Sequence, residues 1–373
     1  MPWKEETVMS LKQDFIVRAL AKETTFSCLC KEFNISRKTG YQLLSKFEKH
    51  GWEGLKTGST IPLNSPNKTS KEVEDKIIQV RLRFPTWGAR KISAFLSKQG
   101  MDNLPAHSTI TEILKRNNLI SIEESLKRKE LIRFERETPN DLWQMDFKGK
   151  FQLLTKQSCY PLTIIDDHSR FSLCLKACPN EQFLPVKKQL TYTFDKYGLP
   201  NQINFDNGNP WGNSKLLPHT KLTVWLMQLG VKVTHSRPRH PQTNGKNERF
   251  HRTLKYDLIL QRAMKTFAHA QKLFNEWRYH YNHERPHEAI SMEVPATRYM
   301  PSKKMMPQKL PPIEYGNDSI VRKVRGNGRI KYANNEFLVG EAFNGFSVEI
   351  KHDYVEKEID IYFGYHKIYT YEI

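Results

Sequence analysis

Residues 140–300 alternate between short apolar runs and longer amphipathic stretches, and this order constrains the fold more than any other feature of the chain. Short strand candidates rich in apolar and β-branched residues come first, at 142–147, 151–154, 162–165 and 171–175. An amphipathic stretch at 181–197 follows and ends at a Gly-Leu-Pro sequence. Beyond it come a short strand, a helix, another strand and a long helix that starts near Lys246. We therefore predict an α/β domain whose first three strands form an antiparallel meander.

This order of strands and helices is typical of a ribonuclease-H-like fold, with a mixed five-stranded sheet flanked by helices. In such a fold the middle of the first strand, the end of the fourth strand and the start of the last helix meet at one edge of the sheet. Three acidic residues occupy those places, namely Asp146, Asp206 and Glu248. We expect their carboxylates to lie close together, although they are far apart along the chain.

The chemistry that three neighbouring carboxylates favour is metal-dependent phosphoryl transfer. They repel each other unless a cation lies between them, and oxygen ligands suit Mg²⁺ or Mn²⁺. Two such ions about 4 Å apart clamp a phosphodiester, activate a water or a 3′-hydroxyl, and stabilise the departing oxygen. Asp146 is expected to bridge both ions, with Asp206 and Glu248 on one ion each. The nearby Asp166 and Asp167 are better explained as residues of a turn, in which Asp166 caps the turn or pairs with Arg170.

The charge of the chain indicates a polyanionic partner. Its 373 residues carry 59 Lys and Arg against 40 Asp and Glu, a formal net charge of +19, and each phosphate that such a protein neutralises releases condensed counterions. No stretch approaches the roughly 20 apolar residues of a membrane-spanning helix, and the start of the chain has no apolar signal-peptide core. We expect no membrane partner and a cytoplasmic location. The five cysteines include no Cys-x-x-Cys pair, so reduced thiols without zinc are expected.

Residues 1–55 are predicted to form a helix-turn-helix domain that binds DNA. Ser36 is a natural N-cap for the third helix, which is expected to turn Tyr41, Leu44 and Phe47 inward. The exposed start of that helix then offers polar and basic side chains to base edges and phosphates, namely Arg37, Lys38, Thr39 and Gln42. The alternative is an ordinary three-helix bundle with a solvated basic face.

Three further domains complete the predicted organisation. Residues 69–120 resemble a second helix-turn-helix unit, opened by a capping box at Thr69 and Glu72, although a helical spacer leaves the same pattern. The α/β domain covers residues 137–300, and recurring short strands predict a small β-barrel at 313–373.

The residues after Glu248 add basic groups to the predicted site. Lys255 lies two helical turns beyond Glu248 on the same face and is placed to reach a phosphate. Arg249 and Arg252 are candidates for DNA binding, although they are also the kind of residues that solvate a helix. The basic loop at 235–245 has the composition expected of a segment that grips a DNA strand, or of a simple connection.

Five sequence motifs resemble those of bacterial insertion-sequence transposases with a retroviral-integrase-type core, the DDE type. They are Trp-Gln-Met-Asp at 143–146, Ile-Asp-Asp-His-Ser-Arg at 165–170, Phe-Asp-Asn-Gly at 205–208, the run 240–255, and Tyr-Asn-His-Glu-Arg-Pro-His at 281–287. The resemblance implies that Asp146, Asp206 and Glu248 are the catalytic acids and that Lys255 is the lysine that follows them. It also implies two Mg²⁺ ions, cleavage of transposon ends, and joining of 3′-hydroxyls to target DNA. A homodimer or higher assembly on DNA is expected, since two ends must be held together.

The chain departs from the retroviral integrases at two points. It lacks their zinc-binding His/Cys pattern near the N-terminus, so helix-turn-helix units are expected to take that place. The gap before Glu248 is also longer than usual, with residues 211–218 as a small insertion.

Two other functions stay open at this level. One is a ribonuclease-H-like nuclease that cuts DNA without joining it. The other is a catalytically silent regulator that binds DNA through residues 1–118. A bacterial protein of any of these kinds is expected in the cytoplasm with the nucleoid.

Overall fold

The computed structural model of the protein separates into two compact units, Met1–Lys68 and Thr69–Ile373, and each is described by itself. The residues that the structure describes are 7–56, 68–120, 135–206, 211, 218–235, 245–353 and 357–372. The four domains predicted from the sequence stay a proposal about how these units are subdivided.

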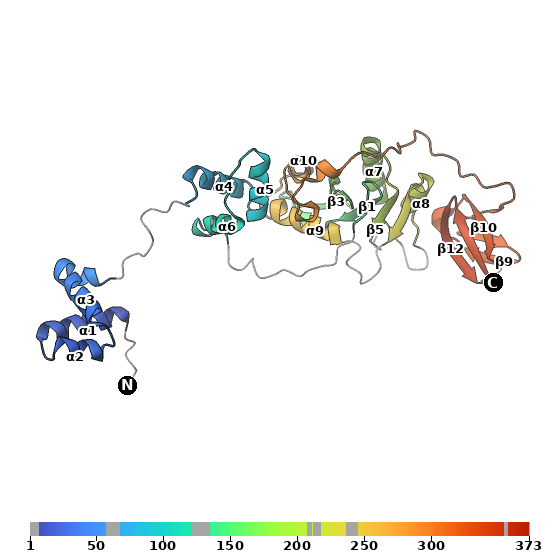
Figure 1. Ribbon diagram of the computed structural model, residues 1–373. Coiled ribbons are helices and arrows are strands. Elements are labelled where there is room, and N and C mark those ends of the chain that lie inside the picture. The colour runs from blue at the N-terminus through green and yellow to red at the C-terminus, as the bar shows by residue number, and fades with distance from the viewer. Residues whose placement is uncertain are drawn as a thin grey trace. The chain divides into compact units, whose positions relative to one another are not determined.

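The first unit is a three-helix group built on a small apolar core (Figure 1). Its helices are α1 (Val8–Ala21), α2 (Phe26–Glu32) and α3 (Arg37–His50), followed by the 3₁₀ turn η1 (Gly51–Leu55). Ser36 caps α3, as predicted, because its hydroxyl accepts a hydrogen bond from the Thr39 amide at 3.1 Å. The core that holds the three helices together consists of Phe15, Ile16, Leu29, Cys30 and Leu55.

The prediction that Tyr41 points inward is wrong. Tyr41 is 58% exposed and its ring stacks on that of Phe26, with 4.3 Å between ring centroids. Gly40, the residue before Tyr41, is buried instead. A Cβ atom at Gly40 would lie 2.8 Å from Cys30 Sγ and 3.1 Å from the Phe15 ring. Leu44 and Phe47 pack against the core as predicted, together with Leu43, so only the start of the apolar face differs from the prediction.

The second unit begins with another helical group, α4 (Lys71–Arg83), α5 (Ala89–Lys98) and α6 (His107–Arg116). Its core includes Ile77, Trp87, Ile92, Leu96, Ile110 and Leu114. The residue that caps α4 is Ser70 and not Thr69 as predicted, because the Ser70 hydroxyl accepts from the Val73 amide at 3.4 Å. This group contacts the α/β part of the same unit through Arg83 with Glu284 (2.9 Å) and Thr86 with Asp257 (2.5 Å).

The α/β part contains the predicted mixed sheet. Its strands are β1 (Leu142–Phe147), β2 (Phe151–Gln152), β3 (Ser158–Asp166), β4 (Ser172–Cys178), β5 (Gln202–Phe205) and β6 (Lys232–His235). β1, β3 and β4 form the antiparallel meander, while β5 pairs in parallel with β1 and β6 in parallel with β5. The order β4-β3-β1-β5-β6 confirms the ribonuclease-H-like fold, and the two-residue β2, which pairs with β3, adds a sixth strand to the five predicted.

Helices cover both faces of this sheet (Figure 1). One face packs on α7 (Phe183–Tyr197) and α8 (Lys221–Gln228) through a core that includes Trp143, Met145 and Phe205. The other packs on α9 (Gly245–Leu254) and α10 (Phe267–His283) through a core that includes Ile165, Leu175 and Phe250. The π-helical turn η4 (Lys255–Ile259) continues α9, and η5 (Glu288–Ile290) and α11 (Pro295–Arg298) follow α10.

The C-terminal part forms the predicted small β structure as two sheets and not as one closed barrel. β7 (Ile320–Lys323), β10 (Ser347–Asp353), β11 (Glu358–Phe363) and β12 (His366–Glu372) make a four-stranded sheet in the order β12-β11-β10-β7. β8 (Arg329–Tyr332) and β9 (Asn335–Leu338) pair as a separate hairpin, and the short 3₁₀ turn η6 (Glu341–Phe343) follows them. Val224 and Met227 of α8 belong to the same apolar core as these strands.

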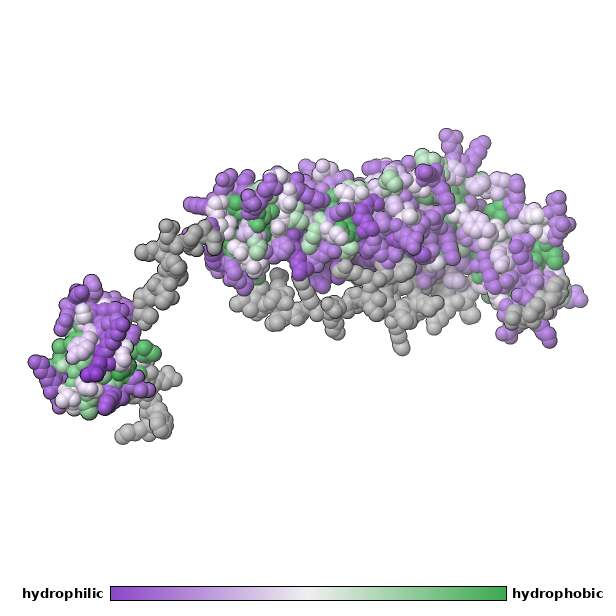
Figure 2. Space-filling model, in the orientation of Figure 1, coloured by the Kyte–Doolittle hydropathy of each residue, from purple (hydrophilic) through white to green (hydrophobic). Residues whose placement is uncertain are grey.

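The described surface is mainly polar. Figure 2 shows hydrophilic residues over most of each unit, with small and scattered apolar areas. Among the described residues, no helix combines the length and the apolar composition that crossing a membrane requires.

The close helix contact at Gly40 yields a test of the first unit. Gly40→Ala is expected to lower the free energy of unfolding of residues 7–56 by about 1–3 kcal/mol, because the added methyl group has no space between Cys30 and Phe15. Amide hydrogen exchange of the α1–α3 peptides in the full chain measures this. Ser45→Ala, at an exposed position of the same helix, is the control and is expected to leave exchange unchanged. Equal exchange in the two variants would contradict the prediction.

Candidate functional site

Asp146 lies near the end of β1, and Asp206 directly follows the neighbouring parallel strand β5. β1 and β5 pair with Gln144 opposite Asn204. Two residues further along, this register brings Asp146 level with Asp206, the first residue after β5. Adjacent strands are about 4.8 Å apart, and residues paired across them project from the same face. The structure therefore brings these two predicted acids together.

Both carboxylates project toward the face of the sheet that α9 and α10 cover. Their neighbours Met145 and Phe205 are buried in the core on the α7 and α8 face. Side chains alternate between faces along a strand, so Asp146 and Asp206 point to the opposite side. The strand pattern thus decides on which side of the sheet this acidic pair lies.

Glu248 lies in the first turn of α9, the helix on that same face, and its side chain is exposed. His251, one turn further along α9, lies against Asp146, with 3.9 Å between His251 Nδ1 and Asp146 Oδ2. The start of α9 is therefore next to the acidic pair. Within the described ranges, however, no group of three or more His, Cys, Asp or Glu side chains is positioned to hold a metal ion. The register of β1 with β5 aligns Asp146 with Asp206, and Glu248 lies on the adjoining helix α9.

The donor set fits a hard divalent cation. The Asp146 side chain is 19% exposed, and Asp206 is also partly exposed, so both carboxylates are open to solvent. Carboxylate oxygens that keep room for water and for substrate phosphate are the ligands that Mg²⁺ and Mn²⁺ prefer. Asp146 and Asp206 are the residues here that are placed to hold such an ion, with Glu248 as the nearest further carboxylate on α9.

His251 is neutral at this site and acts through hydrogen bonds. Burial, followed by the charge of Lys148, lowers the pKa of His251 to about 3. His251 therefore forms no ion pair with Asp146 near neutral pH, although the two side chains are only 3.9 Å apart. The Thr163 hydroxyl donates to the Asp146 carbonyl oxygen at 2.9 Å, so it accepts the 2.7 Å hydrogen bond from His251 Nε2. This chain of contacts joins α9 to β3 and to the backbone of Asp146.

Two lysines lie near the acidic pair. The pKa of Lys148 is lowered by burial and then by the positive charge of Lys255, which places the two ammonium groups near each other. Lys255 begins η4 and is exposed, in keeping with its predicted contact to phosphate. Sequence reasoning missed Lys148 and gave His251 no role. The signal for Lys148 was its position two residues after Asp146, on the same side of the chain.

The surroundings of Asp206 add a second acid and a histidine. His235, the last residue of β6, has its Nδ1 3.0 Å from the Asp206 carbonyl oxygen. Burial and then the negative charge of Asp206 raise the pKa of Glu181. The basic loop predicted to grip DNA lies mainly at 236–244, outside the described residues, as does most of the predicted insertion at 211–218.

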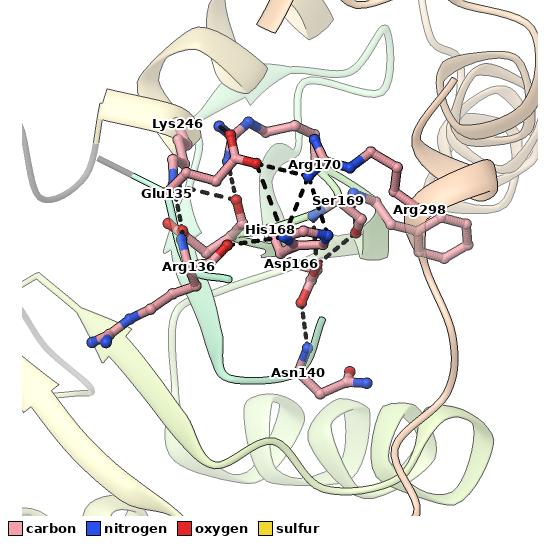
Figure 3. A network of polar contacts seen from close by, with 11 residues as sticks. Glu135, Arg136, Asn140, Asp166, His168, Ser169, Arg170, Lys246 and Arg298 are labelled. Carbon is pink, nitrogen blue, oxygen red and sulfur yellow. Dashed lines mark hydrogen bonds and ion pairs between the residues drawn. The ribbon is translucent and has the colours of Figure 1, made fainter. Parts of the chain in front are cut away.

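The turn after β3 has the structural role that was predicted for its aspartates. Asp166 accepts hydrogen bonds from the Ser169 amide (2.8 Å), the Ser169 hydroxyl (2.6 Å) and the Asn140 amide (2.8 Å). Of the two predicted options, the structure thus shows Asp166 capping the turn, while Arg170 donates its amide to the Asp166 carbonyl oxygen at 3.0 Å and its guanidinium to Glu135 at 2.8 Å. Figure 3 shows Glu135, Arg170 and Lys246 gathered around this turn.

The residues predicted to bind DNA are exposed. Arg37, Lys38, Thr39 and Gln42 lie in the first two turns of α3, and each is exposed. Arg249 and Arg252 are exposed on α9. All six side chains are therefore accessible to a partner, although their role in binding stays a prediction.

The chain matches several known domain families. Two families described as integrase core domain match residues 136–241 and 229–295. A helix-turn-helix domain matches residues 12–60, and a homeodomain-like domain matches residues 39–114. The integrase matches together span the strands and helices that carry the acidic residues.

Among known proteins, the chain is similar to products of bacterial insertion elements. It is 26% identical over 158 residues to an insertion element IS476 protein of Xanthomonas euvesicatoria, across 42% of this chain and 44% of that protein. It is 22% identical over 237 residues to an insertion element IS407 protein of Burkholderia multivorans, across 62% and 82%. A putative integrase of Spiroplasma virus SpV1-C74 is 25% identical over 280 residues, across 68% and 76%. The chain thus spans less than half of the first of these relatives.

Among solved structures, the magnesium complex of the HTLV-2 integrase catalytic core matches with a TM-score of 0.35 and 15% identity, across 44% of this chain and 99% of that one. A simian T-cell lymphotropic virus intasome matches with a TM-score of 0.39 and 15% identity, across 76% and 91%. The chain thus matches integrase core and helix-turn-helix domain families, and it is similar to proteins of bacterial insertion elements.

Proposed function

We propose that this protein is a DDE transposase that binds the terminal repeats of a mobile element, cleaves DNA there and joins the 3′-ends to target DNA. What supports the proposal is the parallel pairing of β1 with β5, because continuing its register by two residues brings Asp146 opposite Asp206, on the face covered by the helix that bears Glu248. A strongly basic chain that gathers acids at one sheet edge is suited to chemistry on nucleic acid.

In this proposal Asp146, Asp206 and Glu248 would hold the divalent ions that the reaction needs, Mg²⁺ or Mn²⁺. When bound, such ions activate the attacking oxygen and stabilise the leaving 3′-oxygen. Lys255 binds a phosphate of the same strand as a point charge, and Arg249 and Arg252 extend that contact along α9. Thr163 and His251 hold the backbone of Asp146 in place through their hydrogen bonds.

DNA selectivity is assigned to the first unit. The start of α3 presents Arg37, Lys38, Thr39 and Gln42 to solvent, which supports its role as a recognition helix in the major groove. Because joining needs two element ends at once, the active form is proposed to be a homodimer or higher assembly on double-stranded DNA. Its proposed location is the bacterial cytoplasm, with the nucleoid.

The acidic residues provide the first test. Asp146→Asn, Asp206→Asn or Glu248→Gln is expected to lower strand transfer at least about 100-fold, because each substitution removes a ligand whose ion contributes several kcal/mol to the transition state. Binding to terminal-repeat DNA is expected to stay nearly intact. A plasmid-joining assay with pre-cut ends, run with Mg²⁺ and with EDTA, measures the reaction. Asp195→Asn, at an exposed position of α7 on the other side of the sheet, is the matched control. An active Asp206→Asn protein would overturn the assignment.

The same assay separates the other two functions. Cleavage of uncut ends without joining of pre-cut ends would indicate a nuclease. DNA binding without Mg²⁺- or Mn²⁺-dependent cleavage would indicate a regulator.

Selectivity for element ends provides the second test. Arg37→Ala with Gln42→Ala is expected to reduce the preference for end DNA over random DNA by about 1–3 kcal/mol per lost base contact. Competition binding at fixed salt measures it. Lys187→Ala is the control, since Lys187 lies over the Trp225 ring of the α/β part. Unchanged selectivity in the double variant would remove the first unit from sequence recognition.

The third test concerns the phosphate contacts of α9. Arg249→Gln is expected to weaken binding to all DNA sequences alike and to reduce the slope of log K against log salt concentration by about 0.9, the loss of one phosphate contact. Lys188→Gln, an exposed position on α7 across the sheet, is expected to keep the parent slope. An equal slope in all three proteins would exclude Arg249 from the DNA interface.

A further inference from the structure

Asp167 is a buried carboxylate that contacts both chain segments on which the proposed metal ligands lie. Its side chain has no exposed surface. It accepts a 2.8 Å hydrogen bond from Gln144 Nε2 on β1 and forms an ion pair with Lys246 Nζ on α9. Gln144 lies two residues before Asp146, and Lys246 lies two residues before Glu248. One carboxylate thus ties the strand of the first acid to the helix of the third.

The backbone of Asp167 strengthens both connections. Its amide donates to the Leu142 carbonyl oxygen of β1 at 2.9 Å. Lys246 Nζ, besides pairing with the carboxylate, donates to the Asp167 carbonyl oxygen at 3.2 Å. The Lys246 side chain is only 15% exposed. Lys246 is therefore held by two oxygens of one buried residue.

Further contacts from neighbouring segments hold Asp167 itself. The Arg136 amide donates to its second carboxylate oxygen at 2.9 Å, and the Arg170 guanidinium donates to its carbonyl oxygen. Glu135 accepts from Arg170 at 2.8 Å and from Arg298 at 2.9 Å. The β3–β4 turn is thereby bound to α11 and to the segment before β1, so Asp167 is a rigid point of attachment.

We propose that Asp167, with Lys246 and Gln144, forms a positioning unit that sets the separation between β1 and the first turn of α9. Its effect on catalysis rests on the proposed function, because it places Glu248 at the level of Asp146 and Asp206. The first turn of a helix lacks the full set of backbone hydrogen bonds, so α9 needs an external attachment there. Displacement of a reacting group by about 1 Å costs on the order of 100-fold in rate.

The test compares three variants of the full chain. Lys246→Met removes the charge but keeps the length of the side chain, and Lys246→Arg keeps the charge. Lys367→Met is the matched control, since Lys367 pairs with Asp360 at 2.7 Å in the C-terminal sheet. Hydrogen exchange of metal-free protein is measured over α9, where the amides of Arg249 and Phe250 depend on the carbonyl oxygens of the first turn. Mn²⁺ binding is measured by electron paramagnetic resonance. Strand transfer is measured by the plasmid-joining assay with pre-cut ends.

Lys246→Met is expected to speed exchange in α9 while β1–β6 exchange as in the parent. Its Kd for Mn²⁺ is expected to rise about 10- to 100-fold, as for other residues that orient a metal ligand. Joining is expected to fall by on the order of 100-fold, with end binding unchanged. Lys246→Arg should restore part of each property, and Lys367→Met should match the parent.

Two results would overturn the proposal. One is parent-like exchange in α9 and parent-like Mn²⁺ affinity in Lys246→Met. The other is faster exchange over the whole sheet, which would indicate a general loss of stability and no positioning of α9. If the parent joins no DNA while exchange and Mn²⁺ binding respond as expected, the positioning unit stands and the proposed function fails.

Discussion

The parallel pairing of β1 with β5 is the constraint on which the candidate site depends. β1 is the strand where an antiparallel meander meets a parallel pair, so it has neighbours from both halves of the α/β part. Its register with β5 brings Asp146 level with Asp206. A shift by one residue would turn one of these carboxylates into the apolar core on the α7 and α8 face, where burial of a charge is very costly. The packing of that core therefore protects the geometry of the acidic pair.

The site combines opposite charges at short range, and burial decides how each is used. Asp146 and Asp206 are partly exposed to solvent, whereas Asp167 is fully buried and pairs with Lys246 inside the protein. Breaking a buried pair leaves an uncompensated charge, which is far more destabilising than loss of a surface pair. The three aspartates thus differ in their roles because their surroundings differ.

The excess of positive charge acts over a longer range than the acidic residues of the site. A net charge of +19 draws a polyanion to the protein over long range, while the few acids at the sheet edge act only at contact. Lys148, two residues after Asp146, is subject to the positive charge of Lys255, so basic groups also act near the acids. A neutral His251 between Lys148 and Asp146 adds a hydrogen bond there without a further positive charge.

Much of this protein is determined by local sequence pattern. The order of strands and helices, the Ser36 cap and the alternation that directs the acids to one face all depend on residues close in the chain, so they were predictable. Other features were decided only by tertiary structure. Tyr41 turned outward because α3 approaches its neighbours at Gly40, and Ser70 rather than Thr69 caps α4. The connection from Asp167 to both β1 and α9 joins residues far apart in sequence, and only packing in three dimensions determines which buried charges meet.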